Sequence, residues 1–257
     1  ARMERGGIFG PKPTGVAVEM TEREWGTPPL SGWQEGVCML QSLPAAVVAH
    51  VVDPQPGERI LDMCAAPGGK STHMAQLMED RGEVVACDRS RSKVAKIAQL
   101  AARLGLQAVK PTKADATCSV DKGIFQPGSF DRVLLDPPCS ALGLRPSLRI
   151  GGLSAWCAAQ SSQTDAQALR SLPSYQRRML HQAHAALRPG GRLVFSTCTL
   201  NPLENEANVA WAVQRLGLIL ESQDAVRVGG GGMAAHGLSE AEAAKVQRFS
   251  PGAQWTG

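Results

Sequence analysis

Two cysteines stand where apolar, β-rich stretches of the sequence end and turns begin. Cys139 closes the stretch LLDPPC, and Cys198 closes VFSTC. Because ligands of an open α/β sheet bind just beyond the carboxyl ends of its strands, we expect both thiols in one cleft. The glycine-rich segment LDMCAAPGGKST at 61–72 ends a third stretch of this kind. The sequence therefore predicts a site that holds a cofactor and two thiols for covalent chemistry.

The glycine-rich segment indicates which cofactor to expect. A phosphate-binding loop needs glycine where this chain has Cys64, which disfavours a nucleoside triphosphate. Glycines that let the backbone approach a nucleoside closely suit a methyl donor instead. Asp88, at the next strand end, can accept hydrogen bonds from two ribose hydroxyls, and Asp115, after a further strand, can contact an adenine. The structural alternative is an ordinary turn in which Asp88 caps the next helix.

The run Asp136-Pro137-Pro138-Cys139 predicts a rigid turn beside the donor. Methyltransferases that act on exocyclic amines carry a similar turn with an aromatic residue in fourth place, which stacks on the target base. Cys139 cannot stack, and this favours attack on a ring carbon. Asp136 is then the candidate for a hydrogen bond to the polar edge of a pyrimidine.

Carbon C5 of cytosine is a weak nucleophile until a thiolate adds to C6 and turns the ring into an enamine. Cys198 is the candidate for that addition, and Cys139 is the candidate second group for release of the product. Lys70 can contact the base or a phosphate, and Lys93 can reach the cofactor. The alternatives are that both cysteines are buried small hydrophobes and both lysines are solvated surface charges.

Strand-like and helix-like stretches alternate along the chain and would position these residues. The predicted strands are 59–63, 83–87, 108–110, 130–135 and 192–197, and the predicted helices are 36–52, 71–80, 90–104 and 174–187. A further helix is predicted with Asn201 as N-cap, Pro202 first and Glu204 three residues after the cap. The alternation predicts an α/β fold, a mostly parallel twisted sheet with helices on both faces. Together with the methyl-donor site inferred above, we expect the Rossmann-like class I methyltransferase fold.

Changes in composition divide the chain into three predicted regions. Residues 1–35 form an N-terminal arm or linker, 36–220 the methyltransferase domain, and 221–257 a C-terminal extension of that domain. Within these regions, 150–172 and the glycine-rich 228–238 are expected to be irregular, and Pro189-Gly190-Gly191 is expected to stop a helix.

Bulk properties exclude several classes of protein. The 257 residues are 43% hydrophobic, enough for one large domain, and the net charge of +4 is compatible with an anionic partner such as nucleic acid. Seven cysteines without a CxxC spacing argue against a disulfide framework and a structural zinc site, so no metal is predicted. No apolar run of about 18 residues occurs, so no membrane partner is predicted, and we expect a cytoplasmic monomer.

Taken together, CAAPGGK, Asp88, Asp115, DPPCS and STCT…ENE resemble the motifs of the Sun-domain (Nop/Sun) family of RNA cytosine-5 methyltransferases. The resemblance covers about residues 36–215, with the motifs in order. Within the family, LQSLPAAVVAHVVDPQPGE and the distal GGGGM…GLS…RFSP are most similar to the sixth mammalian branch. That branch carries an RNA-binding PUA domain upstream and methylates cytosines in transfer and messenger RNA, so the resemblance implies RNA, first of all tRNA, as partner.

The resemblance also implies roles for single residues. Cys198 would be the nucleophile, Cys139 would assist release, and Lys70 and Asp136 would hold the target base. S-adenosyl-L-methionine would be the cofactor and S-adenosyl-L-homocysteine its product. The residues implied in cofactor binding are Cys64, Ala65, Ala66, Pro67, Gly68, Gly69, Lys70, Asp88, Lys93, Asp115 and Asp136.

The chain departs from the family pattern at two points. Ala141 stands where the family usually has glycine after the PPCS tetrad, and the aromatic-rich closing strand of the family is not found before Gly257. The C-terminal extension is therefore expected to lack that strand, and the arm at 1–35 is expected to follow an upstream PUA domain.

Two other functions remain open from the residues themselves. In a DNA cytosine-5 methyltransferase the cysteine of the Pro-Cys motif, here Cys139, would be the nucleophile instead of Cys198. An RNA-binding remnant would hold the cofactor without turnover. Candidate contacts to RNA phosphates, each with ordinary surface charge as its alternative, are Arg145, Arg149, Arg170, Arg177 and Arg178.

Overall fold

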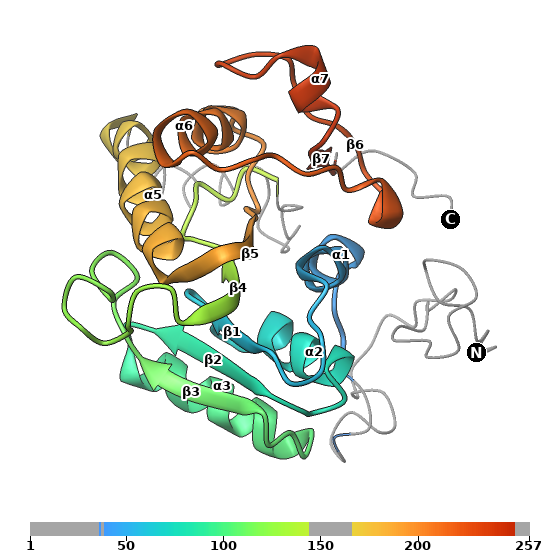
Figure 1. Cartoon of the computed structure of the whole chain (residues 1–257), viewed down its shortest axis with the longest axis vertical. Coiled ribbons are helices and arrows are strands. Elements are labelled where there is room, and N and C mark those ends of the chain that lie inside the picture. The colour runs from blue at the N-terminus through green and yellow to red at the C-terminus, as the bar shows by residue number, and fades with distance from the viewer. Residues whose placement is uncertain (1–35, 37–38, 144–165, 250–257) are drawn as a thin grey trace, which may run out of the picture.

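A five-stranded parallel sheet forms the centre of the molecule, with the strand order β3-β2-β1-β4-β5 (Figure 1). The computed structural model describes residues 36, 39–143 and 166–249. A separate antiparallel pair joins the short strands β6 and β7. The strands are β1 (Arg59–Asp62), β2 (Glu83–Asp88), β3 (Val109–Lys113), β4 (Phe130–Leu135), β5 (Leu187–Phe195), β6 (Gly230–Gly231) and β7 (Gln247–Arg248).

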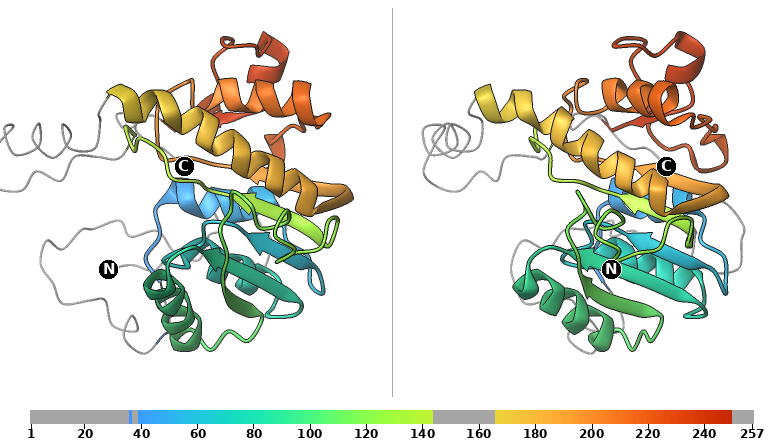
Figure 2. Two further views of the ribbon diagram at one scale, coloured as in Figure 1. Left: turned by 90° about the vertical axis from the view of Figure 1, so that its left-hand side faces the viewer. Right: turned by 60° about the vertical axis from the view of Figure 1, so that its left-hand side comes forward.

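Helices cover both faces of the sheet (Figures 1 and 2). Neighbouring strand residues point to opposite sides, so Ile60 joins the core beneath α1, α2 and α3, and Leu61 joins the core beneath α5 and α6. The predicted α/β fold with helices on both faces is confirmed. The helices are α1 (Leu43–Val52), α2 (Gly69–Leu77), α3 (Arg91–Arg103), α5 (Ala166–Ala186), α6 (Glu206–Leu216) and α7 (Glu240–Ala243), with a 3₁₀ turn η1 (Asp224–Val226).

The strand order places a topological switch point between β1 and β4, which lie next to each other at the centre of the sheet. Strand β2 lies on the other side of β1, and β5 lies on the other side of β4. Ligands of open α/β sheets bind in the crevice outside the carboxyl ends of the strands at such a point. The segments after β1, β4 and β5, which carry the predicted site residues, therefore meet at one edge.

The ends of two helices differ from the sequence prediction. Helix α1 begins at Leu43 and not at residue 36, and Pro44 lies in its first turn, where a missing N–H costs nothing. Helix α6 begins at Glu206 with Asn205 as N-cap, so the predicted cap at Asn201 was wrong. Asn201 instead forms a side-chain turn, in which its Oδ1 accepts a hydrogen bond from the Leu203 N–H at 3.1 Å.

Four further segments differ from expectation. Helix α5 includes 166–172, part of the stretch expected to be irregular; residues 144–165 lie outside the described chain. Strand β3 runs to Lys113, because it is an edge strand that tolerates Pro111. Strand β5 already begins at Leu187, with a register shift across 188–191, so the Pro-Gly-Gly run forms a bulge inside a strand. The glycine-rich loop at 228–238 contains the two residues of β6.

Candidate active site

The two cysteines lie together on the turns that follow β4 and β5. Their sulfur atoms are 3.1 Å apart, with Cys139 partly buried and Cys198 exposed. The Gly143 N–H donates to the Cys198 carbonyl at 3.0 Å and so joins the two turns a second time. Between these contacts, Ala141 adopts a left-handed backbone conformation with φ of 55°, which explains why glycine suits this position. The predicted juxtaposition of the thiols is present in the structure.

The contact between the sulfurs changes the acidity of both thiols. A hydrogen bond from Cys198 lowers the pKa of Cys139 to about 7, against burial, which acts in the opposite direction. The same hydrogen bond, burial and the nearby Asp136 carboxylate raise the pKa of Cys198. The pair therefore releases one proton near neutral pH and holds the other, so that one thiolate is available for covalent chemistry.

A short ion pair lies beside the thiols. The Lys70 Nζ atom is 2.5 Å from Oδ2 of Asp136, and the two side chains are 23% and 26% exposed. Burial lowers the pKa of Lys70, but Asp136, Asp62 and Cys198 together raise it by more, so the lysine remains a cation. The first turn of α2 carries Lys70, and the Pro-Pro turn after β4 carries Asp136. The site thus combines a fixed cation, an acceptor and a thiolate.

Asp62, the last residue of β1, is a site residue that the sequence analysis missed. It is 1% exposed, and burial raises its pKa to about 6. Its Oδ2 accepts a hydrogen bond from Ser71 at 2.7 Å, while its Oδ1 has no partner among the described residues. An acid that closes an apolar strand directly before a glycine-rich segment was the signal that could have identified it.

A cavity of about 240 Å³ opens between the glycine-rich segment and the residues just before α1. Asp62, Lys70 and Asp136 line it. Gly68, which has φ of 111°, does not line this cavity. The backbone of Gly68 lies against α3, where an added Cβ would be 3.4 Å from Ile97. The other residues of its wall are Leu40, Gln41, Ser42, Ala45, Cys64, Ala65, Ala66, Pro67 and Gly69.

Cys64, at the start of the same segment, differs from the catalytic candidates. Burial, followed by the charges of Asp62, Asp136 and Asp88, raises the pKa of its thiol. A thiol that stays protonated is a poor nucleophile. Cys64 therefore belongs to the wall of the site and not to its reactive groups.

The acids after β2 and β3 lie further along the same edge of the sheet. Asp88 is 9% exposed, accepts a hydrogen bond from the Ser90 N–H at 2.9 Å and lies 3.8 Å from the Lys93 ammonium. Two hydrogen bonds from Thr117 lower the pKa of Asp115. Ser90 is itself the N-cap of α3, so the bond from its N–H forms a local turn before the helix. The contacts of Asp88 with a ribose and of Lys93 with the cofactor stay predictions.

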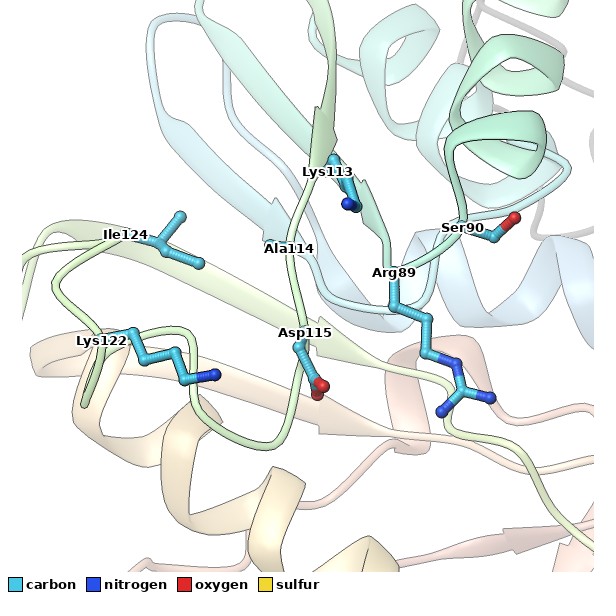
Figure 3. Close-up of a pocket in the computed structure, with 7 residues that line it drawn as sticks. All are labelled: Arg89, Ser90, Lys113, Ala114, Asp115, Lys122 and Ile124. Carbon is cyan, nitrogen blue, oxygen red and sulfur yellow. The ribbon is translucent and has the colours of Figure 1, made fainter.

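A wider hollow of about 600 Å³ lies beside Asp115 (Figure 3). In Figure 3 the Asp115 carboxylate lies between the side chains of Arg89 and Lys122, whose charges also lower its pKa. The predicted site residues therefore fall into two groups. The glycine-rich segment, Asp136 and the cysteines gather at β1, β4 and β5, and Asp115 lies at the second hollow beyond β3.

Of the five arginines proposed as phosphate contacts, the structure describes the side chains of Arg177 and Arg178. Arg145 and Arg149 lie outside the described residues, and Arg170 is in the first part of α5. Arg177 donates to Asn208 at 3.0 Å and lies over the Trp211 ring. Arg178 lies 5.4 Å from the centre of the Tyr175 ring. Arg177 and Arg178 thus have contacts within the protein, which favours the structural alternative for both.

Residues 36, 39–143 and 166–249 contain no group of three or more His, Cys, Asp or Glu side chains arranged to bind a metal ion. None of the helices in this part of the chain has the length and apolar character needed to cross a membrane.

Comparison with known proteins identifies the relatives of this chain. Residues 49–228 match the family model described as 16S rRNA methyltransferase RsmB/F. The tRNA (cytosine(72)-C(5))-methyltransferase NSUN6 of Mus musculus is 41% identical over 265 residues, which cover 98% of this chain and 52% of the relative. The tRNA (cytosine(72)-C(5))-methyltransferase of Pyrococcus horikoshii is 39% identical, covering 92% of this chain and 55% of the relative.

A solved structure agrees with these sequence relatives. The crystal structure of NSun6 from Pyrococcus horikoshii with SFG matches with a TM-score of 0.73 and 38% identity, over 89% of this chain and 53% of that one. The chain thus spans about half the length of these relatives. The predicted resemblance to the Sun-domain family, and within it to the NSUN6 branch, is confirmed. The chain belongs to the RsmB/F, or Sun-domain, family of methyltransferases.

Proposed function

We propose that the protein is an S-adenosyl-L-methionine-dependent methyltransferase that forms 5-methylcytosine in RNA. The observation that carries the proposal is the 3.1 Å contact between Cys139 and Cys198 beside the Lys70–Asp136 ion pair. Two thiols and a fixed cation at the switch point of the sheet suit covalent activation of a pyrimidine. The names of the relatives support transfer RNA as the first substrate to test. Messenger RNA, which the resemblance implies, is the next.

The residues along the crevice fit this cofactor. S-adenosyl-L-methionine carries a sulfonium and an ammonium, and an acid stands at the carboxyl end of each of the first four strands. Asp62 and Asp88 are the last residues of β1 and β2, and Asp115 and Asp136 follow β3 and β4. The Asp62 Oδ1 atom, buried and without a partner among the described residues, is an acceptor suited to a cationic ligand at the smaller cavity. Asp88 and Lys93 would bind the ribose end, and Asp115 would bind near the adenine. When bound, the cofactor supplies the methyl group and leaves as S-adenosyl-L-homocysteine.

The chemistry assigned to the protein begins with the shared proton. Transfer of the Cys198 proton to Cys139, across the contact between their sulfurs, leaves Cys198 as the thiolate. This thiolate forms a bond to C6 of cytosine, while Lys70 and Asp136 hold the polar edge of the base. After methylation at C5, Cys139 releases the proton it received to solvent and then takes the C5 proton. The bond between the Cys198 sulfur and C6 breaks at the same time, which restores the aromatic ring and the shared proton of the pair.

A second candidate function is methylation of cytosine in DNA. One observation favours it: the pKa of Cys139 is lowered while that of Cys198 is raised. In that reaction Cys139 would make the covalent bond and Cys198 would have no essential role. The two functions therefore make opposite predictions for the single alanine variants.

The test is methyl transfer to matched RNA and DNA. The protein is incubated with S-adenosyl-L-methionine and tRNA transcripts, or with DNA of the same sequence, and nucleosides are analysed by mass spectrometry. We expect 5-methylcytosine in tRNA only. Modification of the DNA alone would overturn the proposal in favour of the second function. RNA binding without methylation in either would favour a remnant without turnover.

The remaining parts of the proposal concern partners and location. We propose RNA as the macromolecular partner, a monomer as the active form, and the cytoplasm as the site of action. No metal enters the proposed chemistry, since the thiols and Lys70 supply the nucleophile and the cation. Activity that survives prolonged dialysis against a chelator is the expected outcome.

A further inference from the structure

Glu204 is a completely buried carboxylate that lies between the two cysteine turns. It is 0% exposed and belongs to the turn between β5 and α6. No ion pair links it to a lysine or arginine among residues 39–143 and 171–249, whose side chains the structure describes. A buried charge is retained only where hydrogen bonds replace its hydration, so its donors indicate what it holds in place.

The first two donors come from the residue that follows Cys139. The Ser140 N–H donates to Glu204 Oε2 at 3.1 Å, and the Ser140 hydroxyl donates to Oε1 at 2.5 Å. The first bond fixes the peptide group that directly follows Cys139. A charge-assisted bond of this kind is about twice as strong as a neutral one, so the carboxylate fixes this turn firmly.

The carboxylate also holds the turn that carries Cys198. Its Oε1 accepts a hydrogen bond from the Asn201 side chain at 3.0 Å, three residues after Cys198. The Ser140 hydroxyl oxygen lies 2.7 Å from that of Thr199, which directly follows Cys198. The two turns are therefore joined through Glu204 and Ser140, close to the residues that bear the sulfurs.

Two buried amides hold the carboxylate in turn. The Gln176 side chain donates to Glu204 Oε2 at 2.9 Å and to the Pro138 carbonyl at 3.0 Å. Asn208 donates to Gln176 Oε1 at 2.8 Å, and both amides are 0% exposed. Gln176 of α5 and Asn208 of α6 thus hold Glu204 in place. The side-chain donors named here each have an acceptor, as a rigid buried network requires.

We infer that Glu204 is a positioning residue, which sets the separation of the two catalytic cysteines by holding both of their turns. It acts through Ser140 and Asn201 and does not itself contact the base or the cofactor. The inference rests on the proposed function for its effect on methylation, but its effect on the thiol pair is independent of that function.

The test is Glu204→Gln, which keeps the shape of the side chain. One carboxylate oxygen becomes an NH₂ group, which then faces groups that themselves donate hydrogen bonds. The pH midpoint of alkylation of the cysteine pair by iodoacetamide is measured, followed by methyl transfer to tRNA. If the turns separate, the midpoint rises from about 7 toward about 8.5, because the bond between the sulfurs is lost. For methyl transfer we expect a loss in kcat of about 100-fold, with the KM for S-adenosyl-L-methionine unchanged.

The direction of the shift separates positioning from a simple charge effect. The charged groups that face the pair are Glu204, Asp136 and Lys70, and the charge of Glu204 itself raises the pKa of Cys139. Loss of this charge without movement would lower the midpoint. A lower or unchanged midpoint therefore overturns the inference, even if the variant is less stable.

Two further variants keep the test decisive. Ser140→Ala removes one link while Glu204 stays satisfied by its other donors, so it should fold, raise the midpoint less, and be non-additive with Glu204→Gln. Gln182→Leu is the matched control, since Gln182 is a buried amide of the same helix α5 that bonds residues 120 and 121. It should leave the midpoint unchanged, and a shift equal to that of Glu204→Gln contradicts the inference. If the wild-type protein does not methylate tRNA but the variants show the expected midpoint shifts, the proposed function is rejected and the inference about Glu204 stands.

Discussion

At the scale of single residues, the proton shared by Cys139 and Cys198 determines the reactivity of the site. Their contact at 3.1 Å stabilises one thiolate and makes ionisation of the second thiol harder. Neither thiol would have this property alone, because an isolated cysteine has a pKa of about 8.5. The consequence is that removal of one sulfur changes the acidity of the other, which is measurable without any substrate.

The first prediction concerns this coupling. Cys198→Ala removes the hydrogen bond that lowers the pKa of Cys139, so the midpoint of Cys139 alkylation rises from about 7 toward about 8.5. The measurement is the rate of iodoacetamide labelling of the Cys139 peptide as a function of pH. Cys118→Ala, at a free cysteine elsewhere in the fold, is the control and leaves the midpoint unchanged. A midpoint that stays near 7 in Cys198→Ala would contradict the coupling.

The second prediction concerns Asp62, whose folded-state pKa of about 6 lies above its unfolded value. The folded state therefore holds a proton that the unfolded state has lost, so this contribution to stability is greatest below pH 4 and disappears as pH rises through 6. Asp62→Asn removes this dependence. Relative to the variant, wild type loses about 2.5 kcal/mol of unfolding free energy between pH 4 and pH 7.5.

Urea denaturation of both proteins at the two pH values measures this difference. The comparison cancels the other titrating groups, among them His73, whose pKa burial lowers to about 4. Parallel pH profiles for wild type and Asp62→Asn would show that Asp62 has no raised pKa.

At the scale of elements, the turn after β5 is held from two sides. Glu204 and its donors fix it against the turn after β4. On the other side, Arg248 of β7 forms an ion pair with Glu206 at 2.6 Å and donates to the Leu200 carbonyl at 3.0 Å. Arg248 therefore attaches the small β6–β7 sheet to the segment that follows Cys198.

The third prediction tests this second attachment. Arg248→Ala leaves Glu206, which is 2% exposed, without its cation, and we expect a loss of about 3 kcal/mol in unfolding free energy. Hydrogen exchange should also rise in 230–248. The matched control is Arg81→Ala, whose ion pair with Glu79 is exposed on both sides and contributes less than about 1 kcal/mol. Equal losses in the two variants would contradict a special role for the buried pair.

The elements also show what local sequence can and cannot predict. The apolar runs predicted strands β1, β2 and β4 to within one residue, because fully buried strands need continuous apolar residues. The predicted start of α6 was wrong because Glu204, which has the position of the acid in a capping box after Asn201, is instead bonded to Ser140, 64 residues away. Such a long-range partner leaves no trace in the local pattern.

At the scale of the whole molecule, the strand order brings distant segments to one site. The alternation of strands and helices predicted a parallel sheet, and with it the meeting of the segments after β1, β4 and β5. The sequence could not predict the distance between Cys139 and Cys198 or the unpartnered oxygen of Asp62, since both depend on side-chain packing. Motif order thus predicted the composition of the site, and the structure supplied its electrostatics.

The most direct test of the account is a covalent-trapping gel. Cys139→Ala and Cys198→Ala proteins are each incubated with tRNA and S-adenosyl-L-methionine, denatured and separated. We expect a protein–RNA adduct that persists in Cys139→Ala, because the nucleophile is present and release is impaired, and no adduct in Cys198→Ala. An adduct in Cys198→Ala and none in Cys139→Ala would contradict the account and assign the nucleophile to Cys139.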